Sequence, residues 1–306
     1  MMMLKASTGS LLILLSAVTL DAFAPTTTKT SSHKTATTPT KSNHNQKDAR
    51  CWSFSLALRM SSDTAGTTPT MEALEDAKTA LVNTCSRTPK TSKMEITTLV
   101  DELESLGERL GIGQASSISG LLNGEWELLY SPEDETRSSP FFWAFRKAFP
   151  DNADQIYGIT DAIPAPLREI GPAFQVIDFN PASQSGRFIS RVKVATLGGM
   201  ATSIMTTRAA IVGLDGVDGI RLKIETTKPE ESTIVKTFLG PLSDVVNENT
   251  PAFPSGQALE RVRPGSSEVV LRTTYCDEGL RISRDGDRSS DIYVWGRREF
   301  ASFDFL

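Results

Sequence analysis

Apolar side chains near the start of the predicted folded region recur at helical spacing. In residues 71–87, Leu74 and Leu81 lie two turns apart with further small apolar residues between them on the same face. Residues 93–110 repeat this pattern at greater length. The spacing predicts two helices that form an N-terminal cap over residues 71–113, because a unit this small could not bury a core of its own.

From residue 121 onward, apolar and polar residues alternate instead. Ile220, Leu222 and Ile224 are separated by charged residues, which is the period of a β-strand with one polar face. Turns rich in Gly and Asp separate the alternating segments. Strands are predicted at residues 124–131, 174–179, 188–194, 205–214, 220–225, 234–239, 268–275, 280–284 and 291–295.

Eight or nine short antiparallel strands must either pair into a sandwich or close into a barrel, because exposed strand edges invite aggregation. The chain is therefore predicted to be mainly β. We expect an antiparallel β-barrel of about eight strands over residues 121–306, preceded by N-terminal helices.

An aromatic insertion, residues 139–150, separates the first two predicted strands. Ser139 can cap a helix, Pro140 suits its first position and Pro150 ends it. The aromatic residues could plug the open end of the barrel or pack on the N-terminal helices. They could also form a gate, with the indole and the cations at a membrane interface. The residues of this candidate gate or membrane contact are Phe141, Phe142, Trp143, Phe145, Arg146, Lys147 and Phe149.

Composition and charge exclude several functions. The chain of 306 residues is 39% hydrophobic, enough for a full core. Its net charge is −5, and residues 1–60 hold seven Lys or Arg against two Asp, so the rest of the chain stands at −10. This acidity argues against a nucleic-acid partner, which needs clustered cations.

Residues suited to catalysis or metal binding are scarce. Histidine occurs only at His33 and His44, so a chain without its first 60 residues has no Ser-His or Cys-His pair and no His metal ligand. The three cysteines have neither zinc nor disulfide-framework spacing. The sequence predicts a protein that is not an enzyme, with no cofactor and no metal.

The first 60 residues have the layout of two targeting signals in tandem. Lys5 precedes a short apolar run, which is typical of a signal peptide over residues 1–22 and is too short to span a bilayer. Residues 23–60 are rich in Ser and Thr and poor in acids, as in a disordered transit peptide, and residues 61–70 are a linker. A secreted protein with a Ser/Thr-rich stalk is the alternative.

The junction between these two signals reads Ala22-Phe23-Ala24-Pro25. It resembles the A-F-A-P signature of bipartite presequences in algae whose plastids lie inside extra membranes. The resemblance implies import into a plastid.

Two short features suggest how the barrel closes. The first predicted strand carries Gly124-x-Trp126, and the chain's last part carries Arg281 and Arg284. This arrangement resembles lipocalins, in which a first-strand Trp closes one end of the barrel and a late Arg packs over its ring.

Longer segments around these residues are more specific. Residues 121–130, LLNGEWELLY, resemble the opening strand of the plastid lipid-associated protein family, also called fibrillins. Residues 274–284, TYCDEGLRISR, resemble that family's C-terminal signature, from which Cys276 and Gly279 depart. The resemblance covers nearly all of residues 71–306.

The resemblance implies a lipocalin-like barrel at thylakoids or plastoglobules that binds or organises hydrophobic molecules such as carotenoids, prenylquinones or lipids. Trp126, Arg281 and Arg284 would then bind the ligand or close the barrel. The alternative is a non-catalytic adaptor that docks a thylakoid complex or a prenylquinone-pathway enzyme. Asp277 and Glu278 are adjacent on an extended segment and point to opposite faces, so they do not form an acid–base pair.

The aromatic residue at the signal junction gives a direct test of localisation. We expect Phe23→Ala to leave a fluorescent fusion of the chain outside the plastid stroma, because the first cleavage would no longer expose an aromatic residue. Fluorescence microscopy of the wild-type and variant fusions measures this. Unchanged stromal import of the variant would contradict the predicted bipartite signal.

Overall fold

The computed structural model describes residues 69–87, 90–161, 168–196, 201–233 and 251–298. The chain divides into two units, Met1–Thr68 and Pro69–Leu306. The predicted leader and the strand predicted at 234–239 lie outside the described residues.

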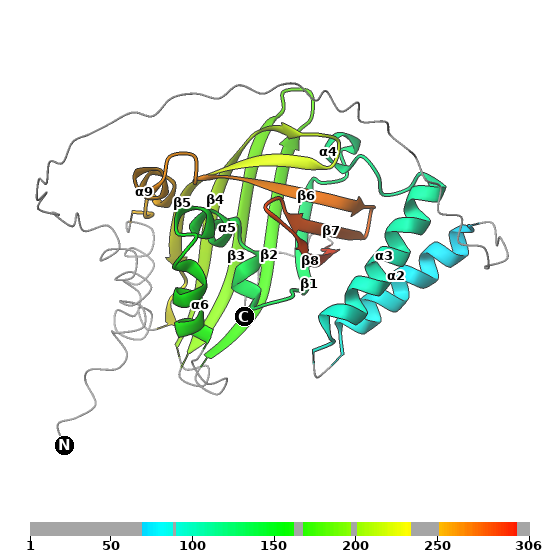
Figure 1. The fold of residues 1–306 in the computed structure, drawn as a ribbon, viewed down its shortest axis with the longest axis horizontal. Helices are drawn as coiled ribbons and strands as arrows, with labels where there is room; N and C mark the ends of the chain where they lie inside the picture. The colour runs from blue at the N-terminus through cyan, green and yellow to red at the C-terminus, as the bar shows by residue number, and fades with distance from the viewer. Residues whose placement is uncertain (1–68, 88–89, 162–167, 197–200, 234–250, 299–306) are drawn as a thin grey trace, which may run out of the picture. The chain divides into compact units, whose positions relative to one another are not determined.

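The described part of the second unit begins with helices and continues as a meander of eight strands (Figure 1). The elements are α2 (Met71–Cys85), α3 (Lys93–Leu110), α4 (Ser116–Ser119), β1 (Gly124–Tyr130), η1 (Glu135–Ser138), α5 (Pro140–Ala148), α6 (Ala153–Asp161), β2 (Arg168–Asn180), β3 (Ser185–Thr196), β4 (Ala201–Asp215), β5 (Gly219–Glu230), α9 (Ser255–Val262), β6 (Glu268–Cys276), β7 (Leu280–Asp285) and β8 (Arg288–Arg297).

The eight strands form a closed barrel in chain order, so each strand is antiparallel to both neighbours. The first and last strands complete the ring, with Trp126 opposite Arg297 and Leu128 opposite Trp295. The predicted fold class, a mainly β barrel of about eight strands behind N-terminal helices, is confirmed.

The barrel wall has two apolar faces, which form two separate clusters. The inner cluster includes Trp126, Phe188 and Trp295. The outer cluster joins one side of the wall to α2 and α3, where Leu81 and Leu103 are fully buried. Figure 1 shows this helix pair beside β7 and β8. The helices therefore cover strands that are apolar on both faces.

Polar contacts fix the helix pair to the barrel. Glu104 of α3 forms an ion pair with Arg284 of β7 at 2.6 Å, and the Thr274 hydroxyl donates to the same carboxylate. Lys78 of α2 pairs with Asp277 at 2.8 Å.

Among the described helices, none is long and apolar enough to cross a membrane.

The connection from α3 to the barrel passes through two glycines with left-handed backbone. Gly111 (φ 70°) ends α3, and Gly113 (φ 76°) accepts a backbone hydrogen bond from Cys276 at 2.9 Å. A Cβ on Gly113 would overlap the buried Tyr275 ring, whereas a Cβ on Gly111 would meet nothing. The two positions thus differ in crowding but not in backbone conformation.

We expect Gly113→Ala to lower the free energy of unfolding by about 1–3 kcal/mol more than Gly111→Ala, because only Gly113→Ala adds overpacking to the left-handed strain. Urea unfolding of both variants measures the difference. Equal losses would show that Tyr275 moves freely and that the contact does not position α3.

Candidate functional site

One end of the barrel is closed by two indoles and a guanidinium. Trp126 is fully buried, and its Nε1 donates to the Leu122 carbonyl at 2.9 Å. The guanidinium carbon of Arg281 lies 5.0 Å from the centroid of the Trp126 ring and 4.8 Å from that of Trp295. These three side chains from β1, β7 and β8 hold the seam where the ring of strands closes.

Arg281 is completely buried, and its charge is poorly compensated. Burial lowers the pKa of Arg281 to about 9, and Arg297, a second cation lying 4.2 Å from the Trp126 centroid, adds to this effect. The group is still a cation at neutral pH. Its Nη2 donates to Gln175 Oε1 at 2.5 Å, but Nε and Nη1 have no hydrogen-bond partner among the described residues.

Arg284 does not belong to this closed end. It lies on the outer face of β7, in the ion pair with Glu104. Residues 281 and 284 are three apart, an odd spacing, so alternation along a strand puts them on opposite faces. The sequence grouped both arginines with Trp126, and that part of the site prediction does not match the structure.

A row of polar side chains crosses the interior next to Arg281. Cross-strand pairing sets Trp126 opposite Gln175, Gln175 opposite Ser190, and Ser190 opposite Thr207. Thr207 in turn pairs with Thr227 of β5. All four polar side chains are buried. Sequence reasoning missed this row, although polar residues at inward positions of alternating strands are its signal.

The aromatic insertion also lies in the barrel interior, where it belongs to the same apolar cluster as Trp126. Trp143 of α5 is 2% exposed, its ring lies 5.8 Å from that of Tyr293 on β8, and its Nε1 donates to the Arg137 carbonyl at 2.7 Å. The Ser138 carbonyl accepts a hydrogen bond from Gln175 in the polar row. The insertion therefore lies in the barrel as a plug.

The remaining residues of the predicted gate are part of the same plug and pack beside Trp143. Phe145 is buried between Phe149 and Tyr157, and Phe141 and Phe142 are half-buried against each other. Lys147 donates to the Glu268 carbonyl at 2.8 Å. The membrane gate needed Trp143 at a surface, and the structure instead buries it because its indole N–H finds a partner inside.

Ion pairs hold the plug to the rim of the barrel. Arg146 of α5 pairs with Glu133 at 2.6 Å and with Asp154 of α6 at 3.6 Å. Arg288 at the start of β8 also reaches Glu133 and Asp154. The same two carboxylates thus bridge the insertion and the rim.

Asp285 lies near this network at the end of β7 and is 3% exposed. Burial raises the pKa of its carboxyl to about 6, the backbone N–H of Asp287 and the charge of Arg146 oppose the rise, and the charges of Asp287 and Asp291 add to it. The carboxyl therefore titrates just below neutral pH.

The chemistry-bearing residues at the Trp126 end do not form a catalytic group. Hydrogen bonds from Lys78 and Tyr275 hold the pKa of Asp277 below its usual value, although burial opposes them. Burial raises the pKa of the Cys276 thiol to about 11. Among the residues that the structure describes, no group of three or more acids, cysteines and histidines could hold a metal ion.

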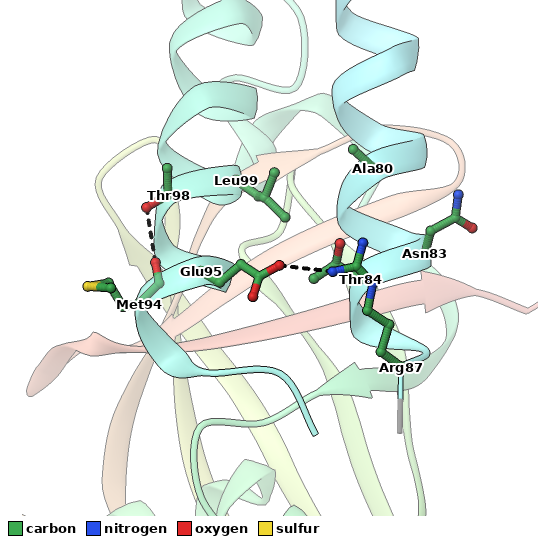
Figure 2. A pocket seen from close by; sticks show the side chains of 8 residues that line it. All are labelled: Ala80, Asn83, Thr84, Arg87, Met94, Glu95, Thr98 and Leu99. Atoms are coloured by element: carbon green, nitrogen blue, oxygen red, sulfur yellow. Dashed lines mark hydrogen bonds and ion pairs between the residues drawn. The ribbon is translucent and has the colours of Figure 1, made fainter. Parts of the chain in front are cut away.

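A surface groove of about 540 Å³ lies between α2 and α3 (Figure 2). Polar contacts also line it, since Arg87 and Glu95 form an ion pair at 3.0 Å and Thr98 donates to the Met94 carbonyl. The lining residues are Ala80, Asn83, Thr84, Arg87, Met94, Glu95, Thr98 and Leu99. None of the residues predicted as a site lies in it.

The fold and the closed end define a class of protein. A single meander of eight antiparallel strands, closed by a first-strand Trp and a late-strand Arg, is a lipocalin-like barrel. The sequence profile of the PAP_fibrillin family matches residues 72–294, which is most of the chain. The chain belongs to this family of plastid lipid-associated proteins, which are generally structural rather than catalytic. No curated protein and no solved structure was found to match it.

Asp285 gives a pH-dependent test of the plugged end. Its folded pKa of about 6 exceeds the ordinary value of 3.8, so the folded state binds the proton more tightly and stability falls as pH rises from about 4 to about 6. We expect Asp285→Asn to raise the free energy of unfolding above pH 6 by about 1–3 kcal/mol, and by less near pH 4.

Urea unfolding of wild type and variant at both pH values measures this effect, and Asp101→Asn, at an exposed position of α3, is the control. A gain of the same size at both pH values would contradict a buried, titrating carboxyl.

Proposed function

We infer that the chain binds or organises hydrophobic plastid molecules, such as carotenoids, prenylquinones or lipids, at thylakoids or plastoglobules. The observation that carries this proposal is the membership of a plastid lipid-associated family together with a closed barrel whose interior is largely aromatic and aliphatic. An eight-stranded barrel is wide enough to hold one small ligand.

The plug supports this function as the part that must move. The α5 and α6 insertion is held by side-chain packing and by ion pairs near the rim rather than by strand pairing. An apolar molecule could therefore enter the interior by displacing the insertion without opening the strand ladder. Bound at the surface of a lipid particle, such a protein would exchange its ligand with the lipid phase.

An adaptor is the second candidate. Large buried side chains, including Trp126, Trp143, Trp295 and Tyr293, already occupy the interior. A barrel filled in this way would serve as a rigid body that docks a thylakoid complex or a prenylquinone-pathway enzyme through its surface.

Loading from a natural lipid mixture separates the two candidates. We expect the full chain, incubated with a thylakoid lipid extract and repurified, to retain stoichiometric isoprenoid or lipid when it is extracted with organic solvent and analysed by mass spectrometry. A lipid-free protein after this treatment would favour the adaptor.

Two variants of β4 provide matched controls. Ala209 is buried in the inner cluster, so Ala209→Leu fills the interior and should lower the retained lipid, at a stability cost of about 1–3 kcal/mol. Val212 is 41% exposed, so Val212→Leu should leave loading unchanged. Equal lipid in both variants would mean that the lipid adheres outside the barrel.

A further inference from the structure

Arg281 is a buried cation without a counter-ion. Among the described residues no carboxylate pairs with it, and Arg297, which lies over the same Trp126 ring, is a cation as well. Two of its guanidinium nitrogens, Nε and Nη1, have no hydrogen-bond partner in the part of the chain that the structure describes. Buried charges in proteins are normally paired, because removing an unpaired charge from water is expensive. The closed end of the barrel therefore favours an anion.

Two further unpaired polar groups belong to the inner face. Ser190 of β3 alternates with the buried Phe188, and Thr273 of β6 alternates with the buried Leu271, so both hydroxyls point inward. Within the described ranges of the chain, neither hydroxyl oxygen has a hydrogen-bond partner. The unpaired polar atoms thus come from strands β3, β6 and β7, on different sides of the ring.

Hydrogen bonds between the barrel wall and η1 indicate which polar groups the interior can bind. Gln175 Nε2 donates to the Ser138 carbonyl at 3.0 Å, and the Tyr293 hydroxyl donates to the Arg137 carbonyl at 3.1 Å. In both contacts the barrel supplies the donor, and η1, which directly precedes the insertion, supplies an acceptor oxygen. A carboxylate offers two oxygens that only accept, and it also carries the charge that Arg281 lacks.

We propose that the barrel interior binds a single-chain lipid with a carboxylate head group, and that Arg281 receives this head group at the closed end while the alkyl chain replaces part of the plug. This inference rests on the proposed function, because it needs an apolar molecule in the barrel. It narrows the proposed ligand class from hydrophobic plastid molecules in general to lipids with a carboxylate head group.

Oleic acid and methyl oleate test the head group on the unmodified full chain. The two lipids share one alkyl chain and differ only in charge. We expect oleate to bind at least about 10-fold more tightly by isothermal titration calorimetry, the effect of a charged hydrogen bond. Equal affinity would overturn the inference and leave the proposed function standing. Binding of neither lipid would also overturn the inference, while the proposed function is decided separately by loading from the thylakoid lipid extract.

Two arginine variants locate the head group. Arg281→Gln should remove the preference for oleate over methyl oleate, while Arg284→Gln, on the outer face of the same strand, should retain it. A preference retained in folded Arg281→Gln would overturn the assignment.

If Arg281→Gln does not fold, NMR of oleate labelled with ¹³C at its carboxyl group decides the question on the wild-type chain. A buried head group paired with Arg281 gives a signal that does not shift between neutral and mildly acidic pH. A signal that titrates like that of free oleate would place the head group in water and overturn the inference.

Discussion

The closure of the barrel depends on keeping one guanidinium out of water. Arg281 of β7 touches indoles from β1 and β8 and hydrogen-bonds to Gln175 of β2, so four consecutive strands around the seam meet at one charged group. Burying a lone cation costs several kcal/mol. A desolvated cation–π contact stabilises the buried charge by about 2 kcal/mol, and a charged hydrogen bond stabilises it by about 1.5–3 kcal/mol. The contacts therefore offset the cost only when all four strands are in place, which links closure of the ring to the position of a single side chain.

The outer face of the same strands explains the N-terminal helices. Ile282 and Val294 point away from Arg281 and Trp295 by alternation, and they are fully buried under α2 and α3. Without the helices these apolar side chains would face solvent. The helix pair is thus part of the barrel fold rather than an appended domain, and Glu104 with Arg284 fixes its position on the wall.

The sequence predicted the elements well because their periods are local. Alternation located the inward and outward residues of β5, and the spacing of apolar residues located α3, since each pattern repeats within one element. By contrast, a pattern within one segment does not say what covers its apolar face. The aromatic face of α5 suited a bilayer as well as a barrel interior, and only the partners of Trp143 distinguish the two.

Two features of the interior have opposite effects on the stability of the empty, plugged barrel. Its aromatic side chains and the plug fill space, which favours a stable empty state, whereas Arg281, Ser190 and Thr273 keep donor groups unpaired, which destabilises that state. A barrel selected only for rigidity would replace a cation at this position with an apolar side chain of similar size. With the cation in place, the plugged state is less stable than it would be with an apolar side chain at this position. An entering ligand therefore needs to supply less free energy to displace the insertion.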